Sequence, residues 1–163
     1  MKKVPILRVT ASQLHDICHQ VAHDAEREVC GIIGGEWIKP GKLAIAREIV
    51  AIPNLDPHPG VRFEMEPSLQ ARTMLDFAKR GLDLVGVYHS HPKGPPYPSE
   101  QDLNEYMYYE ALYLVVFPVG ILSSPSDENK ASSGDTVMLL GYAVRGWKFG
   151  HKSIIAVKFE VEA

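Results

Sequence analysis

The stretch VGVYHSHPKGPPYPSEQDL, residues 85–103, joins an apolar, strand-like segment to two histidines, a proline-rich loop and the pattern Ser-x-x-Asp. Alternate residues of an extended chain point to the same side, so His89 and His91 are predicted to present both imidazoles on one face where a strand ends. A catalytic zinc site uses three protein ligands and leaves a fourth position for water. Asp102 is the carboxylate that can complete this set, from the first turn of a helix expected after the loop.

Ser99 and Asp102 also fit a simpler interpretation. Their spacing is that of a capping box, in which Ser99 is the N-cap residue and Asp102 closes the box. Because the pair follows His-x-His after a loop of seven residues, both roles are expected to coexist. The helix then begins at Ser99 and supplies a metal ligand from its first turn.

The segments around this stretch predict an α/β fold. Helical and extended patterns alternate in the first half of the chain and extended patterns dominate the second, which favours a mixed β-sheet with packed helices. We expect residues 1–163 to form a single domain. The predicted elements are a strand at 4–9, a helix from Thr10 or Ser12 to about 26, a hairpin from 29–37 and 43–52, a helix from Pro67 to Gly81, a strand at 84–88, a helix from Ser99 to about Tyr109, a strand at 111–120, and two or three strands in 136–150 and 153–162.

Composition excludes several classes of protein. The net charge is −3 and the pI is near 6.1, so no nucleic acid and no anionic membrane is expected as a partner. No apolar run approaches the roughly 20 residues that span a bilayer, and the first residues do not form a signal peptide, which predicts a cytoplasmic protein. Cys18 and Cys30 suggest no disulfide framework and are interpreted as reduced, mostly buried thiols. The polar loop at 123–135 is long enough to be a small insertion.

A second group of histidines offers an alternative metal site. His15, His19 and His23 recur every four residues on the first predicted helix, and histidines at that spacing can share a metal ion. They lie on the side away from the apolar face and lack a further ligand, so a solvated polar face is the preferred interpretation. A helix-borne metal-binding module remains the weaker alternative.

Hydrolysis also needs a base that takes a proton from water and returns it to the leaving amine. Glu28 opens the segment EVCGIIGG, where a carboxylate would lie beside a buried strand. The other acidic residues near this strand and near VRFEM fit surface positions better. They are Glu26, Glu36, Glu64 and Glu66. Spacing alone leaves Glu28 as one candidate among several.

The combination of EVCGIIGG with HSHPKGPPYPSEQD resembles the motif of JAMM (MPN+, Mov34-type) zinc metalloproteases, in the compact form of prokaryotic members. That motif is Glu, then His-Ser/Thr-His-Pro, seven residues, Ser, two residues and Asp. The resemblance implies a cytidine-deaminase-like JAMM/MPN fold with one Zn²⁺ per chain, bound by His89, His91 and Asp102. It further implies that Glu28 is the general acid/base acting on the zinc-bound water, and that Ser99 donates a hydrogen bond to the oxyanion.

The same resemblance implies a reaction and a partner. Such enzymes hydrolyse an isopeptide or peptide bond after the Gly-Gly tail of a ubiquitin-like or sulfur-carrier protein. Gly34 and Gly35 are predicted to leave room for an extended tail added to a strand edge. The alternatives are a non-catalytic MPN scaffold and a zinc hydrolase or deaminase of a small amide substrate, although the H-x-E and P-C-x-x-C signature of cytidine deaminases is absent.

Overall fold

The computed structural model describes residues 4–123, 135–150 and 153–163. The nine strands in these ranges form one mixed sheet in the order β6-β7-β5-β4-β2-β3-β1-β9, with β8 paired to β7. This confirms the predicted α/β class. The helices are α1 (Ala11–His23), α2 (Pro67–Lys79) and α3 (Glu100–Glu105), with a 3-10 turn at Val119–Ser123. The strands are β1 (Ile6–Thr10), β2 (Cys30–Lys39), β3 (Leu43–Ile52), β4 (Asp83–Ser90), β5 (Leu112–Pro118), β6 (Val137–Leu139), β7 (Tyr142–Phe149), β8 (Ile154–Ala156) and β9 (Lys158–Glu162).

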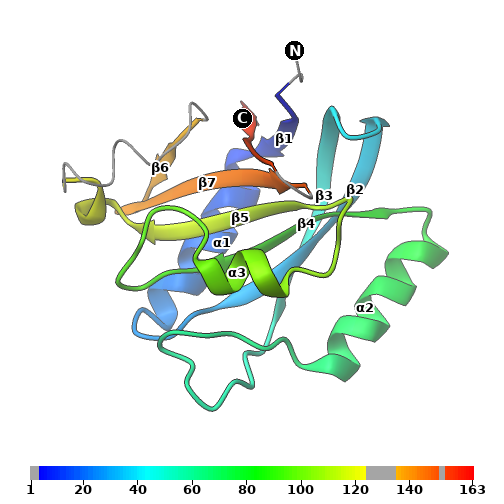
Figure 1. Cartoon of the computed structure of the whole chain (residues 1–163). Helices are drawn as coiled ribbons and strands as arrows, with labels where there is room; N and C mark the ends of the chain where they lie inside the picture. Colours follow the sequence, from blue (N-terminus) through cyan, green and yellow to red (C-terminus); the bar gives the residue numbers. More distant parts are fainter. Residues whose placement is uncertain (1–3, 124–134, 151–152) are drawn as a thin grey trace.

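Helix α1 lies behind the sheet in Figure 1 and covers one of its faces. Its start is a capping box, because Thr10 Oγ1 accepts from Gln13 N at 3.0 Å while the Gln13 side chain accepts from Thr10 N at 2.9 Å. The buried side of the helix is the predicted apolar face, with Leu14, Ile17, Cys18 and Val21. Cys18 and Cys30 are both buried and free, in agreement with the interpretation of two reduced thiols.

Helices α2 and α3 lie on the opposite face (Figure 1). Pro67 occupies the first turn of α2, and Gly81, with φ of +72°, follows the C-cap residue Arg80 as the sequence predicts. Phe77 is the fully buried residue of α2 and packs over β2 at Gly34. A β-carbon at Gly34 would lie 2.7 Å from the Phe77 ring, so this position must be glycine for the helix to approach the strand.

Sheet register determines where the site forms. β2 and β4 are antiparallel with Cys30 opposite His89, and β4 runs parallel to β5. The residues just before β2 therefore lie beside the residues at the end of β4. Glu28 and His89 are distant in sequence and become neighbours through this register.

The structure corrects the predicted role of Gly34 and Gly35. β2 is a central strand, paired with β3 on one side and β4 on the other, so it offers no edge for an added strand. A β-carbon at Gly35 would collide with the backbone oxygen of Ile45, and Gly34 faces Phe77. Both glycines accommodate internal packing and leave no room for a substrate tail.

Helix boundaries differ from the sequence prediction in two places. α1 ends at His23, and α3 ends at Glu105, well before the predicted Tyr109. The chain leaves the helix at Tyr106, whose backbone is extended, because the Tyr106 ring packs edge-on against Tyr113 and Phe149. Tyr108 N also donates to the Tyr113 hydroxyl at 2.9 Å. These tertiary contacts override local helix propensity.

The described residues after β5, at 135–150 and 153–163, contain four strands, β6 to β9, where two or three were predicted. Of the predicted polar loop at 123–135, residues 124–134 lie outside the described part of the chain.

Candidate metal centre

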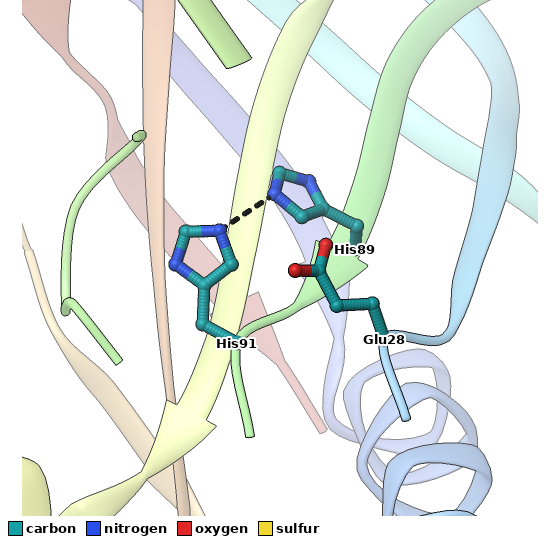
Figure 2. Close-up of side chains that lie close together, drawn as sticks. All are labelled: Glu28, His89 and His91. Atoms are coloured by element: carbon teal, nitrogen blue, oxygen red, sulfur yellow. Dashed lines mark hydrogen bonds between the residues drawn. The ribbon is translucent and has the colours of Figure 1, made fainter. Parts of the chain in front are cut away.

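The end of β4 brings the two histidines of the HSH segment together. His89 and His91 are both buried, and their Nε2 atoms lie 2.9 Å apart (Figure 2). The extended backbone places the two rings on one side, as the sequence predicts. Ser90, between them, points the other way: its hydroxyl accepts from Val29 N at 2.9 Å and donates to Arg27 O at 3.4 Å. The segment His89–His91 therefore presents the two imidazole rings on one side. On the other side, Ser90 binds the backbone of Arg27 and Val29, the two neighbours of Glu28.

Asp102 reaches this position from the first turn of α3. Its Oδ2 atom lies 3.1 Å from His89 Nε2 and 3.0 Å from His91 Nε2. The same Oδ2 accepts from Ser99 N at 2.8 Å, and Ser99 Oγ accepts from Asp102 N at 3.1 Å, which completes the predicted capping box. The cap fixes the carboxylate of Asp102 against the two imidazoles.

These three atoms fit a metal ion. Their pairwise separations are 2.9 to 3.1 Å. Ligand atoms at about 2.0–2.1 Å from a tetrahedral zinc are about 3.3–3.4 Å apart, so a small expansion of the triangle would accommodate the ion. Two neutral imidazole nitrogens and a carboxylate oxygen all present lone pairs, and a shared cation satisfies all three at once.

Glu28 lies beside this triangle. It lies two residues before the first residue of β2, Cys30, and is 6% exposed. Figure 2 shows its carboxylate directed toward the two histidines, and the ligand atoms of Glu28, His89 and His91 lie within 4.8 Å of one another. Within the described residues, Glu28, His89 and His91 form the group of side chains whose ligand atoms are close enough to hold a metal ion. Asp102 adds a fourth side chain to this group, because it contacts both histidine rings.

Burial and charge perturb the acid–base properties of the group. Burial raises the pKa of Glu28 from 4.5 to about 7, against the opposing effect of His91. Burial also lowers the pKa of His89, which favours the neutral ring. For His91, burial acts in the same direction, but hydrogen bonding and charge of Asp102 outweigh it and the pKa is raised. Burial would raise the pKa of Asp102, but its two histidine partners hold that pKa well below its usual range.

Outer contacts orient the two rings. His91 Nδ1 donates to Pro95 O at 2.8 Å, which leaves Nε2 of the neutral ring free to bind a metal. Phe63 stacks on His89 with ring centroids 4.5 Å apart and an interplanar angle of 25°. His89 Nδ1 is buried and has no hydrogen-bonding partner among the described residues.

A cavity of about 380 Å³ opens beside the triangle. Glu28, His89 and Asp102 contribute to its inner wall. The rest of the lining comes mainly from residues 61–65 and from the segment between α3 and β5, and it includes several apolar and aromatic side chains, among them Phe63 and Met65. The volume lies within the range of ligand-binding pockets.

Sequence reasoning missed Phe63 and the role of the segment around it. Val61, Phe63 and Met65 all line the cavity. Arg62 and Glu64, which alternate with them, line the cavity as well. The whole segment 61–65 therefore borders the cavity, and its alternation of apolar and polar residues does not separate a cavity side from a solvent side.

The histidines of α1 form a separate feature. His15, His19 and His23 are exposed, with ring centroids 5.8 Å apart for the first pair and 4.5 Å for the second. Their ligand atoms are not among the metal-competent groups found in the described residues. A solvated helix face agrees with this arrangement.

Comparisons with known proteins support the fold and the family. The family model for prokaryotic homologs of the JAB domain (Prok-JAB) matches residues 10–132. The solution structure of protein DSY2949 from Desulfitobacterium hafniense superimposes with a TM-score of 0.72 at 20% identity, covering 96% of this chain and 92% of that one. At that identity the likeness concerns the fold alone.

Several curated relatives carry functional names, and three of them show the degree of similarity to this chain. The desampylase of Haloferax volcanii is 30% identical over 106 residues, which are 63% of this chain and 71% of the relative. The probable TtuB-protein conjugate cleaving protease of Thermus thermophilus is 29% identical over 100 residues, 61% of this chain and 63% of the relative. Human deubiquitinase MYSM1 is 30% identical over 131 residues, which are 78% of this chain but 16% of that much longer protein.

Among the described residues, no helix is long and apolar enough to cross a membrane.

Proposed function

The chain belongs to the family of prokaryotic homologs of the JAB domain, and on that premise we propose that it is a zinc-dependent isopeptidase or peptidase that cuts after the Gly-Gly tail of a ubiquitin-like or sulfur-carrier protein. The observation that carries this proposal is the convergence of His89, His91 and Asp102 on one point, with a buried glutamate beside them. The names of the relatives, which include desampylase, conjugate-cleaving protease and deubiquitinase, support the reaction class.

His89, His91 and Asp102 would bind one zinc ion. The near-equilateral triangle of their ligand atoms supports this set over one that includes Glu28, whose carboxylate belongs to the wider group within 4.8 Å. When bound, zinc would lower the pKa of a water molecule toward 7 and polarise the scissile carbonyl. Pro95 and the Ser99 cap would hold His91 and Asp102 in their binding orientations.

Glu28 would act as the general acid and base. It would take a proton from the attacking water and then deliver it to the leaving amine. A pKa of about 7 suits both steps, because a group with that pKa accepts and releases a proton near neutral pH. Its burial and its direction toward the histidine pair support this role.

Ser99 would donate a hydrogen bond to the developing oxyanion. Its Oγ already accepts from Asp102 N, and none of the hydrogen bonds between the described residues uses the hydroxyl proton. That proton is free to point at a substrate oxygen. The half-buried position of Ser99 at the start of α3 supports such a contact.

The size of the cavity supports an extended tail as the part of the substrate that enters. About 380 Å³ holds a few side chains and excludes a folded domain. The globular body of the partner would therefore remain outside while its C-terminal residues reach Glu28 and the histidines.

The test uses linear fusions in which ubiquitin or a small sulfur-carrier protein, each ending in Gly-Gly, precedes green fluorescent protein. We expect one zinc per chain, cleavage after the second glycine as identified by mass spectrometry, loss of cleavage with a chelator and recovery with added zinc. Zinc-free protein that cleaves nothing would instead support a non-catalytic scaffold. Zinc-containing protein that hydrolyses small amides but none of the fusions would support the small-substrate alternative.

A further inference from the structure

Asn54 follows β3 and uses the full hydrogen-bonding capacity of its side-chain amide. Nδ2 donates to Glu28 O at 2.8 Å and to Arg62 O at 2.9 Å. Oδ1 accepts from Asp56 N at 3.0 Å and from Glu64 N at 2.9 Å. An amide side chain offers two donated and two accepted bonds, and here all four go to the backbone.

These four bonds fasten three separate pieces of chain together: the start of β2, the turn after β3 and the segment 61–65. Backbone bonds continue the connection, since Leu55 N donates to Glu64 O at 2.8 Å and Glu28 N donates to Pro59 O at 2.6 Å. Glu28 is consequently held by the same loop at both its N–H and its carbonyl. The carbonyl bond depends on a single side chain.

Both segments that Asn54 joins contribute to the site. Glu28 directs its carboxylate toward the histidines (Figure 2), and Phe63 stacks on His89 while lining the cavity. Asn54 does not line the cavity and does not belong to the metal-competent group. Its influence on the site therefore passes through the backbone of these two segments.

We propose that Asn54 is a positioning residue that fixes the general base Glu28 against the Phe63–Met65 wall of the substrate cavity. The inference rests on the proposed function for the role of Glu28. The four hydrogen bonds of the Asn54 side chain, which we call the clamp, are a property of the fold. The carbonyl of Glu28 and the peptide units of 62–64 move together because one amide bonds to both. A misplacement of about 1 Å in a reacting group costs about 100-fold in rate, so this clamp bears directly on turnover.

Asn54→Asp is the discriminating substitution. The two side chains have the same shape, and the carboxylate keeps the accepting side of the clamp toward Asp56 N and Glu64 N. It replaces the NH₂ group with an oxygen that faces two carbonyl oxygens, so both donated bonds are lost and repulsion separates the segments. Asn104→Asp is the matched control, because it makes the same charge change at an exposed position of α3.

We expect Asn54→Asp to keep one zinc per chain, since His89, His91 and Asp102 come from β4, the residue after it and α3. The kcat for the fusion proteins should fall about 100-fold, and amide hydrogen exchange should become faster in peptides covering 26–31 and 61–65 but not in β5 or β7. Asn104→Asp should match the wild type in all three measurements. A merely structural role would lower the melting temperature and leave the kcat of the folded enzyme unchanged.

A wild-type kcat in Asn54→Asp would overturn the proposal, whether or not the hydrogen exchange changes. If the wild-type chain cleaves none of the fusions, the proposed function fails independently of Asn54. Hydrogen exchange then tests whether Asn54 fixes the two segments. Faster exchange of Asn54→Asp in 26–31 and 61–65 would support this, and unchanged exchange would overturn it. Should Asn54→Asp not fold, Asn54→Ser, which retains a hydroxyl donor without a charge, provides the same comparison.

Discussion

Replacing Glu28 by glutamine should change how the stability of the metal-free protein depends on pH. Glu28 is buried, and its burial raises the pKa of the carboxyl in the folded state from 4.5 to about 7. Between these two values the folded protein binds a proton that the unfolded chain has released. Stability therefore falls as pH rises through this window, because the folded state binds more protons than the unfolded state.

The magnitude follows from the two pKa values. Each pH unit between them corresponds to about 1.4 kcal/mol, so the metal-free wild type should lose about 3 kcal/mol of unfolding free energy between pH 4.5 and 7 through this group. Glu28→Gln carries no ionisable group and should escape that loss. The variant should thus gain about 3 kcal/mol relative to the wild type across the window, which corresponds to about 10 °C in melting temperature for a protein of this size.

The assay is urea unfolding of chelator-treated protein at half-unit pH steps from 4.5 to 8, with the variant-minus-wild-type difference plotted against pH. Taking the difference removes the contributions of titratable groups that do not interact with Glu28, while the coupling of Glu28 to His91 and Asp102 stays in the difference. Glu26→Gln, an exposed position two residues earlier, is the control and should give a flat difference. A flat difference for Glu28→Gln as well would show that burial does not oppose ionisation of this carboxylate.

Three further substitutions test other parts of the site and fold. Ser99→Ala should lower kcat about 100- to 1,000-fold through loss of an oxyanion donor. Ser99→Thr is its control, because threonine retains both the hydroxyl group and the capping interaction. Equal rates for the two variants would remove Ser99 from the mechanism. Asp102→Asn should weaken zinc binding by more than about 100-fold, measured by chelator competition, because about 100-fold is the upper limit for residues that only orient a metal ligand. Unchanged zinc affinity would refute the role of Asp102 as a ligand. Gly34→Ala should cost about 1–3 kcal/mol in urea unfolding, because the added methyl group lies 2.7 Å from the buried Phe77 ring; wild-type stability would contradict that packing.

The local geometry of the candidate site was predictable from the sequence, whereas the roles of its residues stay predictions. His89, His91, Ser99 and Asp102 lie within fourteen residues of one another, and strand periodicity, capping and loop length act over that range. Glu28 was different. Its place beside the histidines depends on the register of β2 against β4, which short-range patterns do not determine, so its assignment rested on resemblance.

Errors arose where tertiary contacts decide the conformation. A glycine pair in a strand predicts a close approach but does not say what approaches, and Gly34 and Gly35 proved to accommodate Phe77 and the β3 backbone. The end of α3 depends on the hydroxyl of Tyr113, a residue of the next strand. Asn54 and Phe63 lie in an irregular segment, and the contacts that make them important come from elements far away in the sequence.

The most direct test of the central claim is the cleavage rate of zinc-loaded Glu28→Gln compared with that of the wild type, on whichever Gly-Gly fusion the wild type cuts, with zinc content measured on the same samples. The variant should retain one zinc per chain, because the three proposed ligands are untouched, and should lose about 100- to 10,000-fold in rate, as expected for removal of a general acid/base. A fully zinc-loaded variant that cleaves at the wild-type rate would contradict the assignment of Glu28 and the mechanism built on it.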